Sequence, residues 1–164
     1  MDSWLQLLPE CEGNTLLIEM LGYKNPNHTS NIGQVAKKLQ DNFTNRTAIG
    51  IIDKDKSSIP SYFRAFDLID SFDYLEFKKH PEKSHYIIML IPAFEDFILQ
   101  VADDIDVSIK NYKFNTEKYF REQCKKQNTR SNQNLKNFLN TINQKRAPST
   151  EKIKAWISEI LPPD

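Results

Sequence analysis

Cysteine, glycine and long apolar runs are scarce in this sequence, and each scarcity counts against a class of protein. The 164 residues include two cysteines, Cys11 and Cys124, which stand far apart and outside any Cys-x-x-Cys or Cys/His cluster. This arrangement argues against a disulfide framework or a zinc site. Four glycines and no low-complexity tract argue against a long linker. No apolar run approaches the ~20 residues that span a bilayer, and no signal peptide is evident, so we expect a cytoplasmic protein without membrane contact.

The remaining composition is typical of one globular domain. The chain is 39% hydrophobic and 27% charged, with a formal net charge of zero. The charge is unevenly distributed, because acids predominate over residues 67–106 and bases over residues 110–154. Such a division suits a protein that binds a metal ion with one half and a polyanion with the other. An ordinary lysine-rich surface gives the same pattern.

Hydrophobic periodicity predicts an α/β fold. Apolar runs rich in β-branched residues predict strands over 4–8, 47–52, 74–77 and 85–91. Helical spacing predicts helices over 15–21, 31–43, 59–69 and 93–101, then polar helices over 114–127, 132–143 and 149–161. We therefore expect a small, partly parallel sheet flanked by helices in residues 1–106. Residues 107–164 form a helical extension packed on it, and the whole is one compact domain.

The most informative motif is the buried strand that ends in Asp53-Lys54-Asp55. The carboxyl end of such a strand is where an open α/β sheet places its ligands. Two carboxylates held close together repel each other and gain from a divalent cation between them. In the alternative interpretation, the motif is a solvated turn whose acids are neutralised by Lys54 and Lys56.

Two further acidic points follow predicted strands. Glu12, with Glu10 nearby, comes after the first strand, and Glu95 with Asp96 comes after the strand over 85–91. Parallel strands end at one edge of a sheet, so four or five carboxylates are expected there. Mg²⁺ or Mn²⁺ favours such oxygen ligands and serves phosphoryl transfer. Taken alone, Glu12 can also be a loop carboxylate, and Glu95 an acid that interacts with a helix dipole.

These elements resemble TOPRIM domains. Cys11-Glu12-Gly13-Asn14-Thr15 before a helix is similar to their Glu-Gly element, and Ile51-Ile52-Asp53-Lys54-Asp55 to their Asp-x-Asp element. Pro92-Ala93-Phe94-Glu95-Asp96-Phe97-Ile98 resembles a later acid in TOPRIM-like nucleases of the overcoming-lysogenization-defect type and their small stand-alone relatives. The resemblance covers about residues 5–101.

The resemblance implies a metal-dependent nuclease acting in DNA processing or phage defence. It implies that Glu12 is a metal ligand or general acid/base, that Asp53 and Asp55 hold Mg²⁺ or Mn²⁺, and that Glu95 is a second-metal ligand. The expected partner is nucleic acid, with a protein partner or a homo-oligomer as further possibilities. Candidate nucleic-acid contacts are the lysine pairs Lys78-Lys79 and Lys125-Lys126.

Other interpretations remain open. The same fold can serve as a non-catalytic interaction module or partner subunit. An acid-pair phosphatase with Asp53 as nucleophile is the least favoured, because no small Thr/Gly turn follows the acids. The three histidines show no metal-ligand spacing, and we expect His28 to be a surface residue. Eight apolar residues of two predicted helices are expected in the core: Phe63, Phe66, Leu68, Ile69, Phe94, Phe97, Ile98 and Leu99.

Overall fold

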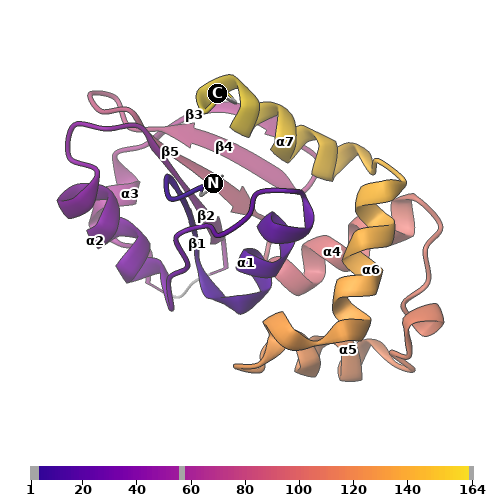
Figure 1. The fold of residues 1–164 in the computed structure, drawn as a ribbon. Helices are drawn as coiled ribbons and strands as arrows, with labels where there is room; N and C mark the ends of the chain where they lie inside the picture. The colour runs from indigo at the N-terminus through magenta and orange to yellow at the C-terminus, as the bar shows by residue number, and fades with distance from the viewer. Residues whose placement is uncertain (1–3, 56–57, 163–164) are drawn as a thin grey trace.

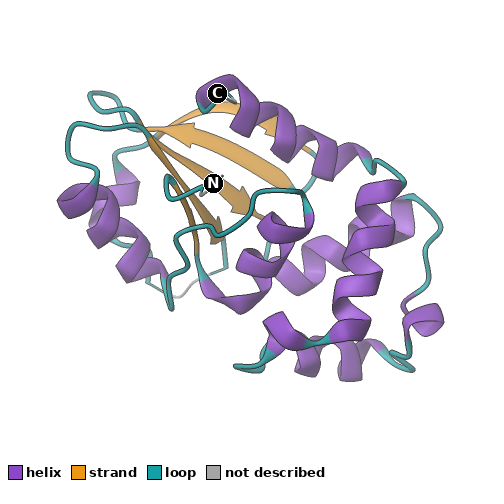
Figure 2. Cartoon of the chain, viewed as in Figure 1, coloured by secondary structure: helices purple, strands orange, loops and turns teal. Residues whose placement is uncertain are grey.

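The computed structural model describes residues 4–55 and 58–162, and it has an α/β fold with a helical C-terminal part (Figures 1 and 2). The regular elements in chain order are β1 (Leu7–Pro9), α1 (Cys11–Met20), α2 (Ile32–Asn42), β2 (Ala48–Asp53), α3 (Ser61–Arg64), β3 (Asp67–Phe72), β4 (Leu75–Lys79), β5 (His85–Leu90), α4 (Phe94–Asp104), η1 (Ile109–Tyr112), α5 (Glu117–Cys124), η2 (Thr129–Ser131), α6 (Gln133–Gln144) and α7 (Pro148–Ile160). The predicted fold class is therefore confirmed.

The strands form one mixed sheet in the order β1-β2-β5-β4-β3. β1, β2 and β5 are parallel neighbours, and β4 and β3 continue the sheet in antiparallel fashion. Pro9 is the last residue of β1, an edge strand, where its missing N–H interrupts no ladder. The carboxyl ends of three adjacent parallel strands therefore lie along one edge of the sheet.

Both faces of the sheet are covered. Successive apolar side chains of its parallel strands point to opposite faces, so each face needs a partner layer. Leu8, Ile52 and Ile87 pack with α2 and α3 in one cluster. Ile49 and Ile88, with other residues of their face, pack in a larger cluster with α1, α4 and the C-terminal helices. The latter cluster runs from Leu7 to Leu161, so the C-terminal helices share a core with the sheet.

One predicted helix is wrong. The segment 59–69 contains only the short α3, and the chain then enters β3, which pairs with β4 across a tight turn at Asp73 and Tyr74. Phe63 and Phe66 are buried as expected, but Leu68 is 56% exposed and Ile69 is 48% exposed. The apolar residues that predict one helix here belong to two elements, the helix α3 and the exposed edge strand β3. These two elements have different periods, so their combined spacing resembles that of a longer helix.

The other predicted elements are confirmed with small shifts at their ends. α2 begins after Asn31, whose side-chain oxygen accepts a hydrogen bond from the Gln34 N–H, as its position predicts. α1 begins at Cys11, four residues earlier than expected, and this places Glu12 in a helical first turn rather than in a loop. Within the described residues, no helix is long and apolar enough to cross a membrane.

Candidate functional site

Backbone hydrogen bonds join the loops that leave β1, β2 and β5. The Glu10 N–H donates to Ile51 O over 2.8 Å, which fixes the start of α1 against β2. The Asp55 N–H donates to Pro92 O over 2.9 Å, and this bond fixes the Asp-x-Asp loop against the segment before α4. The loops that carry the acids are therefore held against one another by backbone hydrogen bonds.

The four acids predicted as site residues line one cavity of about 880 Å³ at this edge of the sheet. Glu12 comes from the first turn of α1, Asp53 and Asp55 from the end of β2, and Glu95 from the first turn of α4. His28 lines the same cavity, and Lys125, Lys126 and Gln127 from the end of α5 complete its wall. The cavity therefore has an acidic side built on the sheet and a basic side built on the C-terminal helices.

Asp53 is the buried acid of the cavity, with 4% of its surface exposed. Its Oδ1 accepts a hydrogen bond of 3.1 Å from the Asn14 side-chain amide. Its backbone N–H donates to Oε2 of Glu10, which is itself buried. Glu10, which the sequence marks only as a neighbour of Glu12, therefore ties the end of β1 to the end of β2.

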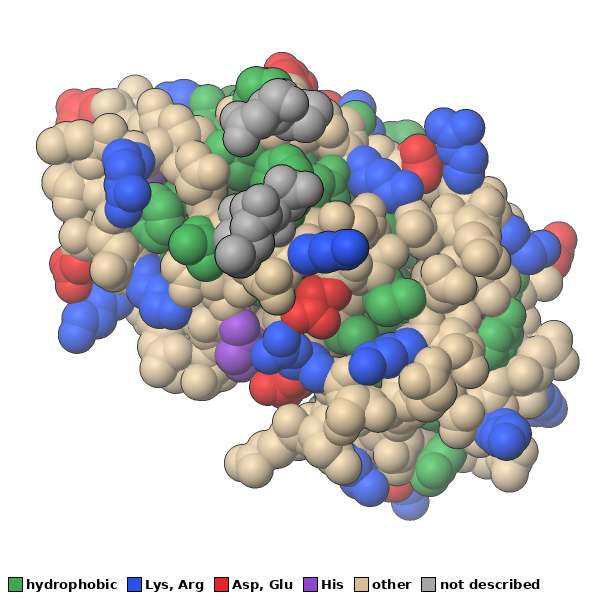
Figure 3. All heavy atoms as spheres, in the orientation of Figure 1, with side chains coloured by type: hydrophobic (Ala, Val, Ile, Leu, Met, Phe, Trp, Pro, Cys, Tyr) green, Lys and Arg blue, Asp and Glu red, His purple; other side chains and the backbone are tan. Residues whose placement is uncertain are grey.

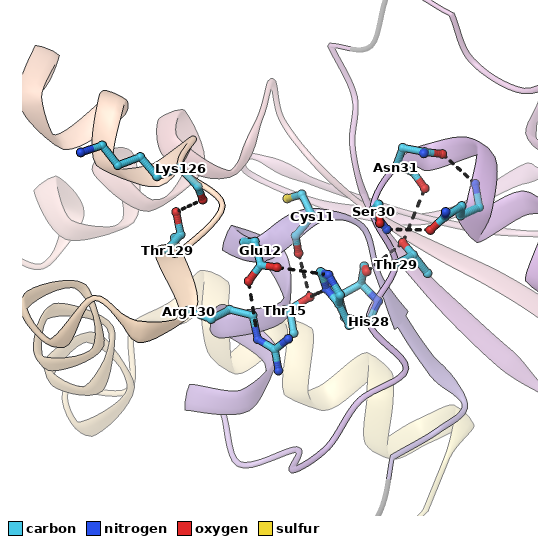
Figure 4. A network of polar contacts seen from close by, with 12 residues as sticks. Cys11, Glu12, Thr15, His28, Thr29, Ser30, Asn31, Lys126, Thr129 and Arg130 are labelled. Carbon is cyan, nitrogen blue, oxygen red and sulfur yellow. Dashed lines mark hydrogen bonds and ion pairs between the residues drawn. The ribbon is translucent and has the colours of Figure 1, made fainter.

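Glu12 lies between two nitrogen-bearing side chains, His28 and Arg130 (Figure 4). Its Oε1 is 3.3 Å from His28 Nε2, and its Oε2 is 3.7 Å from Arg130 Nε. Thr15 Oγ1, 2.7 Å from His28 Nδ1, fixes the imidazole ring. Partial burial lowers the pKa of His28, against the opposing effect of Glu12, and this favours a neutral ring at pH 7.

The two remaining acids differ in their surroundings. Asp55 is exposed. Glu95 Oε1 is 3.6 Å from Lys125 Nζ, so this acid also faces a cation from the end of α5. Asp96, the neighbour of Glu95, pairs with Arg121 and lines a different cavity. Lys54 pairs with Glu76, and Lys56 lies outside the described residues.

Both cysteines line the cavity as thiols. Burial, followed by the charge of Asp53, raises the pKa of Cys11 to about 12. Burial likewise raises the pKa of Cys124, with a smaller contribution from Glu95. Both side chains are therefore protonated at neutral pH and act as small apolar groups rather than as nucleophiles.

The donors of the cavity suit a hard divalent cation in kind. They are carboxylate oxygens. Asn14 does not line the cavity, but its buried amide oxygen, Oδ1, has no hydrogen-bond partner among the described residues. Flipping the Asn14 amide would not help, because its oxygen would then face Asp53 Oδ1. In the described part of the chain, however, no three or more His, Cys, Asp or Glu side chains are arranged to hold a metal ion. The chemistry fits Mg²⁺ or Mn²⁺, while Glu12 and Glu95 are turned toward cationic side chains.

The two predicted lysine pairs have different positions. Lys125 and Lys126 are exposed and line the cavity. Lys78 and Lys79 lie on β4, where Lys78 Nζ is 3.9 Å from Glu76 and Lys79 Nζ donates to the backbone oxygens of His80 and Lys83. Neither residue lines the cavity.

Sequence reasoning missed Asn14, His28 and Arg130 as members of the site. Asn14 sits in the Glu-Gly motif, two residues after Glu12, and this position on the buried side of α1 was a usable signal. His28 and Arg130 reach Glu12 from a loop and from η2. No local sequence pattern links them to it. No known protein family, curated protein or solved structure matches this chain significantly.

Proposed function

We propose that this protein is a metal-dependent nuclease that hydrolyses phosphodiester bonds of nucleic acid. The observation that carries the proposal is the meeting of Glu12, Asp53, Asp55 and Glu95 in one cavity opposite Lys125 and Lys126. Acids that gather a divalent cation, facing bases that attract a polyanion, are the two parts that phosphodiester hydrolysis requires.

The residues have distinct proposed roles. Asp53 and Asp55 hold Mg²⁺ or Mn²⁺ with Glu12, and Glu95 serves a second ion. When bound, such an ion activates water and stabilises the leaving oxygen. Asn14 orients Asp53 through its hydrogen bond, and the buried Glu10 orients the end of β2. Lys125 and Lys126 hold the phosphate backbone. The resemblance to small TOPRIM-like nucleases supports a role in DNA processing or phage defence.

A non-catalytic interaction module is the second candidate, and one observation favours it. Glu12 and Glu95 already face Arg130 and Lys125, and the described residues contain no ready-made metal cluster. In such a module the same ion pairs hold the helices on the sheet, and no metal is needed.

Asp53→Asn separates the two candidates. The new amide keeps an oxygen acceptor for Asn14 and removes a buried charge, so the metal-free protein should stay folded with an unchanged or higher melting temperature. Metal binding should be lost. We expect Mn²⁺ to raise the melting temperature of the wild type but not of the variant, and cleavage of labelled DNA and RNA to fall at least about 100-fold, because one ligand of the ion is gone.

Asp73→Asn is the matched control. Asp73 lies in the β3–β4 turn with a φ of 46°, a conformation that asparagine also adopts readily. This control should keep both the metal response and the cleavage. A wild-type protein whose melting ignores millimolar Mg²⁺ and Mn²⁺, and which cuts neither nucleic acid, is an interaction module instead.

A further inference from the structure

One short segment supplies the cations that face the acids of the cavity. This basic segment (residues 124–131) runs from the end of α5 through η2. Its Lys125 faces Glu95, and its Arg130 faces Glu12. Lys126, between them, lines the cavity and makes no ion pair within the described residues. On the face drawn in Figure 3, acidic and basic side chains are interspersed around a histidine near the middle of the view.

The backbone of the basic segment is fixed independently of the cavity acids. Thr129 is 1% exposed, and its hydroxyl lies 2.6 Å from Lys126 O and 2.8 Å from Gln123 O. Arg130 is also anchored by Glu19, with its second guanidinium nitrogen 2.7 Å from Glu19 Oε1. If Glu12 and Glu95 turned away, the segment and its cations would therefore stay beside the cavity.

Glu12 and Glu95 cannot serve a divalent cation and these side chains equally well at the same time. A divalent ion draws the carboxylate oxygens to ~2.1–2.5 Å, whereas their present contacts to Arg130 and Lys125 are long, at 3.7 Å and 3.6 Å. Long, part-exposed ion pairs are weak. The ion would displace them, and the released guanidinium and ammonium groups would have N–H donors available to another anion at or beside the cavity.

We propose that Lys125, Lys126 and Arg130 form a phosphate-binding site that becomes complete only when divalent cations take Glu12 and Glu95 from them. This inference rests on the proposed metal site. Before the ion binds, the two acids and two bases neutralise each other, and only Lys126 is available to an anion. Afterwards Lys125 and Lys126 both face the cavity, Arg130 beside it keeps its contact with Glu19 but no longer meets Glu12, and the bound metal adds positive charge. Linkage then requires that nucleic acid and metal each strengthen the binding of the other.

The test combines two measurements on the full chain. Calorimetry measures Mn²⁺ binding alone, and fluorescence anisotropy measures a labelled single-stranded oligothymidine in Mn²⁺ or in EDTA, with oligonucleotide integrity checked on a gel. For the wild type we expect about tenfold tighter oligonucleotide binding in Mn²⁺. Arg130→Gln should bind Mn²⁺ more tightly, because a competitor for Glu12 is gone, yet show a smaller Mn²⁺-induced gain for the oligonucleotide. A merely structural role of Arg130 would weaken both.

Arg121→Gln is the matched control, because it removes the same charge from α5, the helix that precedes the basic segment. Arg121 pairs with Asp96 outside the cavity, so this variant should match the wild type in both measurements. Equal oligonucleotide affinity in Mn²⁺ and EDTA, for a wild type that binds Mn²⁺, overturns the inference and leaves the metal site standing. Mn²⁺ binding weakened by Arg130→Gln also overturns it. A wild type that binds no Mn²⁺ overturns both proposals.

Discussion

Asn14 connects the buried acid of the cavity to the interior of α1. Its side-chain N–H stabilises the Asp53 carboxylate, while its own Oδ1 is buried and without a hydrogen-bond partner in the part of the chain that the structure describes. A buried acceptor without a donor costs free energy unless something else satisfies it. A cation beside Asp53 is a physical reason to keep such an oxygen there.

Asn14→Asp tests this interpretation. The variant places a second carboxylate against Asp53 in a buried position, so we expect the metal-free protein to lose about 1–3 kcal/mol of its free energy of unfolding. A divalent cation would neutralise the pair. The rise in melting temperature on adding Mn²⁺ should therefore be larger for Asn14→Asp than for the wild type.

Asn14→Leu provides the comparison, because it removes both the hydrogen bond to Asp53 and the unpartnered oxygen. This variant should also be destabilised, without a larger response to Mn²⁺. If Mn²⁺ raises the melting temperature of neither the wild type nor Asn14→Asp, the unpartnered oxygen of Asn14 has no relation to a metal ion.

The contact between α1 and α4 sets the spacing of the acids on these two helices. A Cβ atom at Gly13 would lie 2.5 Å from Cδ1 of Phe94, so only glycine lets the first turns of the two helices approach this closely. Glu12 is the residue before Gly13, and Glu95 is the residue after Phe94. The glycine of the Glu-Gly motif thus has a packing role that brings two cavity acids together.

Gly13→Ala should push Phe94 away and separate these acids. Overpacking of this kind costs about 1–3 kcal/mol of the free energy of unfolding, and the metal response should weaken with it. Gly33→Ala in α2 is the comparison, because its Cβ would lie 3.2 Å from Asn31 Oδ1, the oxygen that caps α2, and would meet no cavity residue. We expect this variant to lose less stability than Gly13→Ala, since alanine favours a helix over glycine, and to keep the full metal response. A Gly13→Ala protein as stable and as metal-responsive as wild type would rule out the packing role.

Strong local patterns made most elements predictable. β2 and β5 are continuous apolar runs buried on both faces, and α2 has a cap and a clear apolar stripe, so each was recognisable alone. β3 was not, because it is an exposed edge strand with Asp67 and Asp70 among its apolar residues, and only its pairing with β4 makes it a strand. The acids at the strand ends could be predicted, because each directly follows a recognisable strand in the sequence.

The role of Arg130 could not be predicted, because it reaches Glu12 only through tertiary packing.

The uneven charge along the chain is partly cancelled in the folded molecule. Bases from the segment 110–154 pair with acids from the segment 67–106: Lys152 with Asp70, Arg121 with Asp96, and Lys125 with Glu95. Trp156 of α7 adds a hydrogen bond of 2.9 Å to Asp70 on β3. The charge division that suggested a polyanion-binding half therefore also reflects how the C-terminal helices dock on the sheet. Six of the twelve bases in that segment make no ion pair among the described residues, and of these six only Lys126 lines the cavity of the candidate site.

The small number of bases at the cavity predicts a shallow dependence of nucleic-acid binding on salt. Each neutralised phosphate of a single strand contributes about −0.7 to the slope of log K against log salt concentration. If only Lys125, Lys126 and Arg130 meet phosphates, the slope in Mn²⁺ should be about −2, and Lys126→Gln should reduce its magnitude by about 0.7. Anisotropy titrations of single-stranded oligothymidine across a salt series measure it. A slope near −8 would correspond to all twelve bases between residues 110 and 154. That result would mean that the ion pairs to the sheet open and that the whole basic surface binds the oligonucleotide.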